Sequence, residues 1–144
     1  MGDLTRHFSV AEFERSETAS ARGIDNSVRE PEVRDALFHL CARVLQPLRD
    51  AVRHPLHVNS GYRCPELNAA VGGVKTSQHT RGEAADIAHY DLQDPLELAR
   101  IARTLGLPYD QIIIYPTFTH ISHRLHGTQR GRILYNKSYN GITL

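Results

Sequence analysis

The sequence has few cysteines and almost no excess charge, and each shortage excludes a class of protein. Its 144 residues include two cysteines, Cys41 and Cys64, too few for a disulfide framework or a CxxC zinc site. Cys41 falls on an apolar helical stripe and Cys64 in a loop, and a bridge between them stays open. The 17 basic and 16 acidic side chains give a formal net charge of +1. No excess charge therefore favours nucleic acid or an anionic membrane as a partner, and we expect no nucleic-acid binding.

Long hydrophobic runs are also absent from the sequence. No segment approaches the ~20 apolar residues that a membrane-spanning helix needs, so we expect no membrane span. The opening stretch, MGDLTRHFSVAEFERSE, is polar, which argues against a secretory signal peptide. We therefore expect a protein that acts inside a cell, is released by lysis as a phage enzyme would be, or has lost a leader.

The remaining composition is that of an ordinary globular protein, with 40% hydrophobic and 23% charged residues. A chain of 144 residues can bury a core without disulfides. No repeat, low-complexity tract or linker divides it, so we expect a single domain over residues 1–144. We also expect a monomer.

The spacing of apolar residues predicts several helices. The strongest begins at Pro31, where apolar residues recur at three- and four-residue steps as far as Val52, and Pro47 is expected to kink or break its last turns. Ser9 and Glu12 have the spacing of a capping box at the start of an earlier short helix, or two helical turns, that Gly23 ends. The other predicted helices are one over 65–71 and one over 94–106.

β-rich segments predict a small sheet. LHVNSGYR and AADIAH each predict a strand, and the segments DQIIIY, FTHIS and RILYN predict three more, expected to be antiparallel neighbours. Helices come first and strands dominate the end of the chain. We therefore expect an α+β fold with helices packed on a small, mostly antiparallel sheet.

The stretch SQHTRGEAAD contains the first candidate functional residues. His79 and Asp86 lie seven positions apart, and the small residues between them let the backbone turn so that the two side chains converge. Zinc binds imidazole nitrogen and carboxylate oxygen, and a catalytic zinc site uses three protein ligands and a water. His120 or His123 could supply the third ligand. Side chains alternate along a strand, so only one of these two histidines would join the site.

These spacings also have a purely structural interpretation. In that interpretation His79 is a loop histidine, Asp86 caps the start of a strand, and His120 is a hydrogen-bonded core imidazole. Residue spacing alone does not choose between a metal site and this alternative.

The chain resembles a known family along nearly its whole length. The run SGYRCPELNAAVGGVKTSQHTRGEAADI, followed by DQIIIYPTFTHIS, is similar to the M15 zinc D-Ala-D-Ala peptidases, whose hallmark is SxHxxGxAxD with a later histidine on a strand. The resemblance implies the fold that these peptidases share with the signalling domain of Hedgehog proteins. The residues that match the hallmark and the upstream Gly-Tyr-Arg segment are Gly61, Tyr62, Arg63, Ser77, His79, Gly82, Ala84 and Asp86.

The resemblance implies a role for most of these residues. His79, Asp86 and His120 would be the zinc ligands, and Arg63 would hold the substrate or polarise its carbonyl group. Ser77 and Tyr62 are candidate substrate contacts. The implied activity is hydrolysis of peptide bonds in bacterial cell-wall stem peptides next to D-Ala, by zinc-activated water.

The sequence departs from the family at the general base. The family has a carboxylate a few residues before the last zinc histidine, whereas Thr117 stands three positions before His120 and YPTFT contains no acid. Another segment could supply the base, zinc could act without one, or the protein could bind zinc and peptide without turnover. The candidates for a base from elsewhere are Asp110, His123, Glu83 and Asp91. Of these, we expect Asp110 and His123 to be catalytic, together with Arg63.

Overall fold

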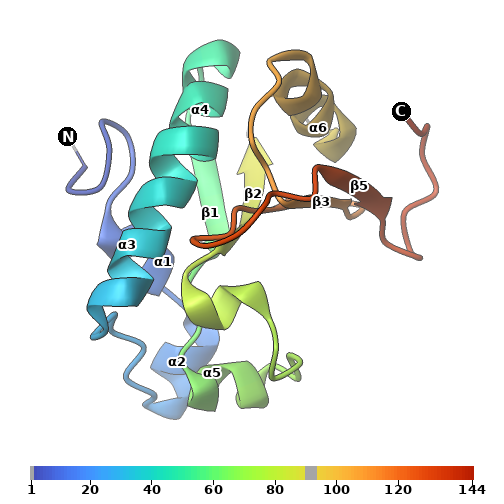
Figure 1. Cartoon of the computed structure of the whole chain (residues 1–144). Helices are drawn as coiled ribbons and strands as arrows, with labels where there is room; N and C mark the ends of the chain where they lie inside the picture. Colours follow the sequence, from blue (N-terminus) through green and yellow to red (C-terminus); the bar gives the residue numbers. More distant parts are fainter. Residues whose placement is uncertain (1, 90–93) are drawn as a thin grey trace.

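A computed structural model describes residues 2–89 and 94–144 (Figure 1). Asp91, one of the candidate bases, lies outside these described residues. The α+β fold is confirmed: helices lie against one mostly antiparallel sheet. No helix of the described part is long and apolar enough to cross a bilayer. The helices are α1 (Val10–Glu14), α2 (Glu17–Arg22), α3 (Pro31–Leu40), α4 (Gln46–Val52), α5 (Pro65–Ala70) and α6 (Pro95–Thr104).

The predicted long helix is confirmed, with a local change near Pro47. A π-helical turn, Cys41–Leu45, joins α3 to α4, and the N–H group of Gln46 donates to the carbonyl of Cys41, five residues back. Proline lacks an N–H group and its ring crowds the carbonyl four residues earlier. The wider turn accommodates Pro47 without ending the helix.

The predicted capping box at the first helix is wrong. Ser9 is the N-cap of α1, but its side chain makes no cap hydrogen bond. Instead the Asp3 carboxylate accepts a hydrogen bond of 2.8 Å from the N–H group of Val10. The acceptor at this helix start therefore comes from a residue that precedes the predicted box.

The sheet has five strands in the order β1-β2-β4-β3-β5. All neighbours are antiparallel except β3 and β5, which are parallel. The prediction of antiparallel neighbours is right for β3 and β4 and wrong for β5. The loop 123–131 leaves the end of β4, passes the first residue of β3 and places β5 on the far side of β3, so that β5 runs parallel to β3. The strands are β1 (Leu56–Ser60), β2 (Ala84–His89), β3 (Gln111–Ile114), β4 (Thr119–Ser122) and β5 (Arg132–Tyr135).

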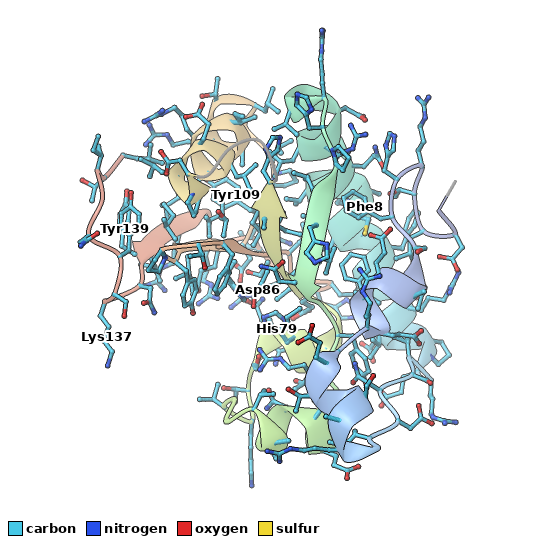
Figure 2. All side chains as sticks on the ribbon, turned by 180° about the vertical axis from the view of Figure 1, so that it is seen from behind. Phe8, His79, Asp86, Tyr109, Lys137 and Tyr139 are labelled. Atoms are coloured by element: carbon cyan, nitrogen blue, oxygen red, sulfur yellow. The ribbon has the colours of Figure 1, made fainter. Side chains whose placement is uncertain are left out.

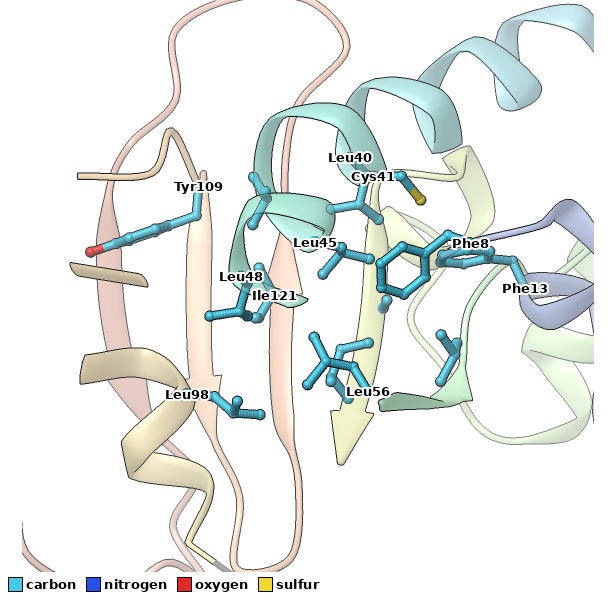
Figure 3. Packing of buried hydrophobic residues seen from close by; sticks show 14 of the residues in the cluster. Phe8, Phe13, Leu40, Cys41, Leu45, Leu48, Leu56, Leu98, Tyr109 and Ile121 are labelled. Carbon is cyan, nitrogen blue, oxygen red and sulfur yellow. The ribbon is translucent and has the colours of Figure 1, made fainter. Parts of the chain in front are cut away.

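The two faces of the sheet have different chemistry. On one face, isoleucines such as Ile87 and Ile121 are fully buried in the core, which also contains Leu45 and Leu48 of the long helix and Leu98 of α6 (Figure 3). Successive side chains on a strand point to opposite faces. The neighbours of these isoleucines therefore project from the other face, and these neighbours include two of the predicted metal ligands.

Both thiols are free. Cys41 is buried in the core, and burial raises the pKa of its thiol far above the ordinary range. Cys64 precedes α5, where its sulfur accepts a hydrogen bond from the N–H group of Leu67. The two cysteines therefore serve packing and helix capping, and the open question of a bridge between them is answered.

The buried side chain of Asn26 connects the N-terminal helices to the Gly-Tyr-Arg segment. Its amide nitrogen donates to the carbonyl groups of Glu14 and Tyr62, at 2.9 Å each. Its amide oxygen accepts from the N–H group of Cys64 at 2.8 Å. These three bonds fix the backbone on both sides of Arg63.

We expect replacement of Asn26 by alanine to destabilise the protein. Asn26→Ala removes the partner of two carbonyl groups and one N–H group, and each unsatisfied buried group costs about 1–3 kcal/mol. Urea denaturation should show a free energy of unfolding lower by at least about 2 kcal/mol. Asn140→Ala, at an exposed position, is the matched control and should change little. Equal stability of the two variants would contradict this account.

Candidate metal centre

The segment between His79 and Asp86 folds back through a short helix and one glycine. Residues Gln78–Arg81 form a 3-10 helix, and Gly82 follows with a φ of 73°, a left-handed conformation that side chains disfavour. A Cβ atom at Gly82 would lie only 2.7 Å from the carbonyl oxygen of Val33. Glycine is therefore required where the segment turns against α3 and enters β2.

His79 is held by its backbone and by one ring nitrogen. Its Nδ1 lies 2.7 Å from the carbonyl oxygen of Gly61, which can only accept, so Nδ1 carries the proton. Nε2 is then the ring nitrogen that faces the site, 3.4 Å from Oδ1 of Asp86. The backbone of His79 accepts a bond of 3.0 Å from the N–H group of Arg63 and donates to the hydroxyl of Ser77 at 3.2 Å.

Strand pairing brings the other two residues together. Asp86 on β2 is the register partner of His120 on β4, and Oδ1 of Asp86 lies 2.9 Å from Nδ1 of His120. The rings of His79 and His120 have centroids 5.1 Å apart. One ligand atom from each of the three residues lies within 4.8 Å of the other two. Figure 2 shows Asp86 on its strand with His79 next to it.

This donor set fits a divalent metal ion. Burial raises the pKa of Asp86, but hydrogen bonds and charges from His120 and His79 outweigh burial and hold this pKa well below its ordinary value. The carboxylate is therefore ionised. Two imidazole nitrogens and one carboxylate oxygen are a set that catalytic zinc sites use, with a fourth position left for water or substrate. Among the described residues no other such group of three potential ligands was found.

The three residues line one cavity, and Asp86 also lines a second. The first, which we call the arginine cavity, has a volume of about 500 Å³, and all three candidate ligands line it. The second, which we call the helix cavity, has a volume of about 620 Å³ and lies against the start of α2 and the edge strand β1. Asp86 and Arg63 line both cavities. A bound molecule could therefore extend to either side of the candidate metal centre.

The predicted substrate contacts lie around these cavities. Ser77 lines the arginine cavity and Tyr62 lines the helix cavity. Arg63 is half-buried, and its buried Nε has no hydrogen-bond partner among the described residues. Burial lowers the pKa of Arg63, while the charge of Asp86 acts in the opposite direction. A guanidinium group remains charged in proteins, so Arg63 presents an unsatisfied cation beside Asp86.

Two candidate bases, Asp110 and Glu83, are engaged in ion pairs. Asp110 is fully buried and pairs with Arg130 at 2.8 Å. Burial raises the pKa of Asp110, but hydrogen bonds from Arg130 and the charges of Arg124 and Arg130 lower it to about 2. Glu83 accepts from Arg81 and from the backbone N–H group of Leu125, at 2.9 Å each. Both carboxylates connect the C-terminal loop to the rest of the structure.

The third candidate, His123, is buried on the helix side. Burial lowers the pKa of its imidazole, and the charges of Arg43 and His39 on the long helix act in the same direction. His123 lines neither of the two cavities around Asp86, whereas His120 lines the arginine cavity. The structure therefore brings His120, and not His123, to the other two ligands, as expected from strand alternation.

Two further residues, Glu17 and Tyr115, line the cavities. Glu17 lines the helix cavity, and among the described residues that line either cavity only Glu17 and Asp86 have a carboxylate. Tyr115 lines the arginine cavity and stacks on Phe118 with ring centroids 4.4 Å apart. Burial and the charge of Asp86 raise the pKa of Tyr115, and Arg63 lowers it. Tertiary packing alone brings Glu17 near this site, so no local spacing predicts it.

A comparison with family models agrees with this geometry. The model described as Peptidase M15 matches residues 6–122. The chain belongs to the peptidase M15 family. The matched range of this M15 protein includes Arg63 and the three candidate metal ligands, and it ends before Arg124, Arg130 and β5. No curated protein gives a match.

We expect zinc binding to depend on all three candidate ligands. The wild-type protein should retain one zinc ion per chain after dialysis, and saturating zinc should raise its melting temperature because the ion binds only the folded state. His120→Ala should lose both properties, measured by elemental analysis and thermal denaturation. His126→Ala removes an exposed histidine and is the matched control. Equal zinc retention in the two variants would exclude this site.

We expect the Asp110 ion pair to make stability depend on acid pH. The pKa of Asp110 is lowered from 3.8 to about 2 in the folded state, so its ionised form stabilises the protein above pH 3.8. That contribution decreases as the pH falls toward the folded-state value. Asp110→Asn should be less stable than wild type at pH 7 and should lose less stability on acidification. Urea denaturation at neutral and acid pH tests this, with Asp35→Asn, at an exposed carboxylate, as the control.

Proposed function

We propose that this M15 protein is a zinc metallopeptidase that hydrolyses peptide bonds in bacterial cell-wall stem peptides, at a bond next to D-Ala. The observation that carries the proposal is the convergence of His79, Asp86 and His120 in the arginine cavity, which Arg63 also lines. Family membership supports a peptidase. The cell-wall substrate follows from the resemblance to D-Ala-D-Ala peptidases.

The three ligands would hold zinc through Nε2 of His79, Nδ1 of His120 and the carboxylate of Asp86. When bound, zinc acts as a Lewis acid and lowers the pKa of water from 15.7 to about 7. One carboxylate leaves a net positive charge at the site. The hydrogen bond from His79 to Gly61 fixes the orientation of the first imidazole, which favours binding in a single geometry.

Arg63 would stabilise the negative charge that develops on the substrate carbonyl oxygen. Its side chain is half-buried, and a charge in a partly dry site interacts more strongly than one in water. Its backbone is fixed by the bond from Arg63 N–H to the carbonyl of His79, so the cation is positioned relative to the ligands. Tyr115 lines the same cavity and offers a second hydrogen-bond donor.

Three residues are proposed as the proton acceptor. Asp110 and His123 are those of the four sequence candidates that we expected to be catalytic, and Glu17 is added because it lines the helix cavity together with Arg63 and Asp86. Glu17 is exposed and lies in the first turn of α2. Among the described residues, none forms an ion pair with it. We favour Glu17, since both oxygens of Asp110 already accept hydrogen bonds from Arg130.

A second candidate function is a zinc-containing module that binds peptide without cleaving it. The observation that favours it is the lack of any carboxylate other than Asp86 among the described residues that line the arginine cavity. Both functions would use the same ligands and Arg63. Only turnover distinguishes them.

We expect the zinc-loaded protein to cleave a defined stem pentapeptide, with fragments detected by mass spectrometry. A chelator should abolish cleavage and added zinc should restore it. Arg63→Gln should lower kcat/KM by about 100-fold, the typical loss when one donor to a developing oxyanion is removed. Glu17→Gln should lower kcat without changing zinc content, and Arg22→Gln, on the same helix, is the charge control. Absence of fragments from a zinc-loaded protein that still binds the peptide would favour the binding module.

A further inference from the structure

We propose that Arg124 binds an anionic group of the substrate, so that the peptides accepted by this site carry a carboxylate on the arginine-cavity side of the metal centre. This inference rests on the proposed function for the choice of a peptide ligand. Its physical basis is the guanidinium group of Arg124, which lines the arginine cavity and is not needed to neutralise a carboxylate there. Arg124 lies outside the range that matches the M15 family.

The arginine cavity contains more positive than negative charge. The four arginines that line it are Arg63, Arg81, Arg124 and Arg130, and among the described residues that line it only Asp86 carries a carboxylate. Arg81 is paired with Glu83 at 2.9 Å. The chain as a whole has a formal net charge of +1, so this excess is local to the cavity.

Asp110 does not need Arg124 for its own neutralisation. Arg130 already donates to Asp110 from its backbone N–H at 2.9 Å, from Nε at 3.1 Å and from Nη2 at 2.8 Å. Gln78 donates a further bond of 3.2 Å. Arg124 approaches the same carboxylate only through Nε, at 3.4 Å. One buried carboxylate therefore faces two guanidinium groups, and Arg130 and Gln78 take its hydrogen-bonding capacity.

The guanidinium group of Arg124 makes few contacts within the protein. Its side chain is 38% exposed, and its other contact is a long one of 3.5 Å from Nη1 to the carbonyl of Thr128. A guanidinium group has five N–H donors and binds a carboxylate through two parallel bonds. Most of these donors remain available to a molecule in the cavity.

The backbone of Arg124 is fixed independently of its side chain. Its N–H group donates to Oε1 of Gln129 at 2.8 Å, and Nε2 of Gln129 donates back to its carbonyl at 2.9 Å. The next N–H group, of Leu125, donates to Glu83 at 2.9 Å. A cation on a rigid backbone loses less conformational entropy when it binds. Removal of the side chain should therefore leave the loop in place.

Two sources of carboxylate fit this chemistry. One is the free C-terminus of the peptide, which would make the protein a carboxypeptidase. The other is an acidic residue within the peptide, which would be compatible with cleavage at an internal bond. Both would pair with Arg124 while the scissile carbonyl lies near Arg63.

Kinetics on three stem pentapeptides tests the proposal: one with a free C-terminus, one with a C-terminal amide, and one whose glutamate carboxylate is converted to an amide. We expect one of the two amides to raise KM about 10-fold in the wild type, as expected for loss of a charge-assisted hydrogen-bonded pair. The amide that raises KM identifies the source of the carboxylate. Arg124→Gln should raise KM for the free-acid peptide and remove this discrimination, with kcat little changed. Arg103→Gln, at an exposed position of α6, should keep this discrimination.

Binding without turnover separates this proposal from the proposed hydrolysis. NMR titration of the zinc-loaded protein with N-acetyl-D-alanine and with its amide measures the preference for a carboxylate. We expect Arg124→Gln to reduce that preference at least fivefold and Arg103→Gln to preserve it. If no pentapeptide is cleaved but this result holds, the hydrolysis fails and the anion site stands. An unchanged preference in Arg124→Gln overturns the anion site, whatever the enzyme cleaves.

Discussion

The antiparallel pairing of β2 with β4 is the constraint on which the site depends. It places Asp86 directly opposite His120 on the sheet face that points away from the long helix, while Ile87 and Ile121 enter the core on the other face. A shift of the register by one residue would exchange these faces and bury the carboxylate in the core. The hydrophobic core therefore also fixes which side chains line the candidate metal centre. His79 joins them through the turn at Gly82.

Much of the fold could be predicted because local patterns and tertiary packing agree. The apolar stripe from Pro31 to Val52 is long enough to predict one helix, and AADIAH predicts the bounds of β2. The family hallmark adds the three ligands, whose convergence the sequence alone could not establish. Spacing shows that His79 and Asp86 are able to meet, whereas the hydrogen bond from His79 to Gly61 shows which ring nitrogen is free.

The parts that the sequence could not predict depend on contacts between distant segments. The path of the loop 123–131 sets the direction of β5. The alternation of apolar and polar residues within RILYN predicts a strand but not its direction. The position of Asp110 before a strand suggests an available base, but Arg130 of that loop donates hydrogen bonds to both of its carboxylate oxygens. Glu17 lies near the site through tertiary contacts, among them the hydrogen bonds of Asn26 and Tyr62 that connect α1 to the Gly-Tyr-Arg segment. Each depends on geometry that a single-sequence pattern does not contain.

The same C-terminal loop connects the structural and the chemical features of the arginine cavity. Its ion pair with Asp110 and its backbone hydrogen bond to Glu83 do not involve the three candidate ligands, but they hold Arg130 and Arg124 at the edge of the cavity. A buried carboxylate that pairs with one arginine and faces a second creates a local positive field in a nearly neutral chain. The family-matched segment thus holds the candidate ligands, and the segment beyond it adds positive charge to the cavity that they line. The charge of this cavity can therefore change through this loop without altering the strands that position the candidate ligands.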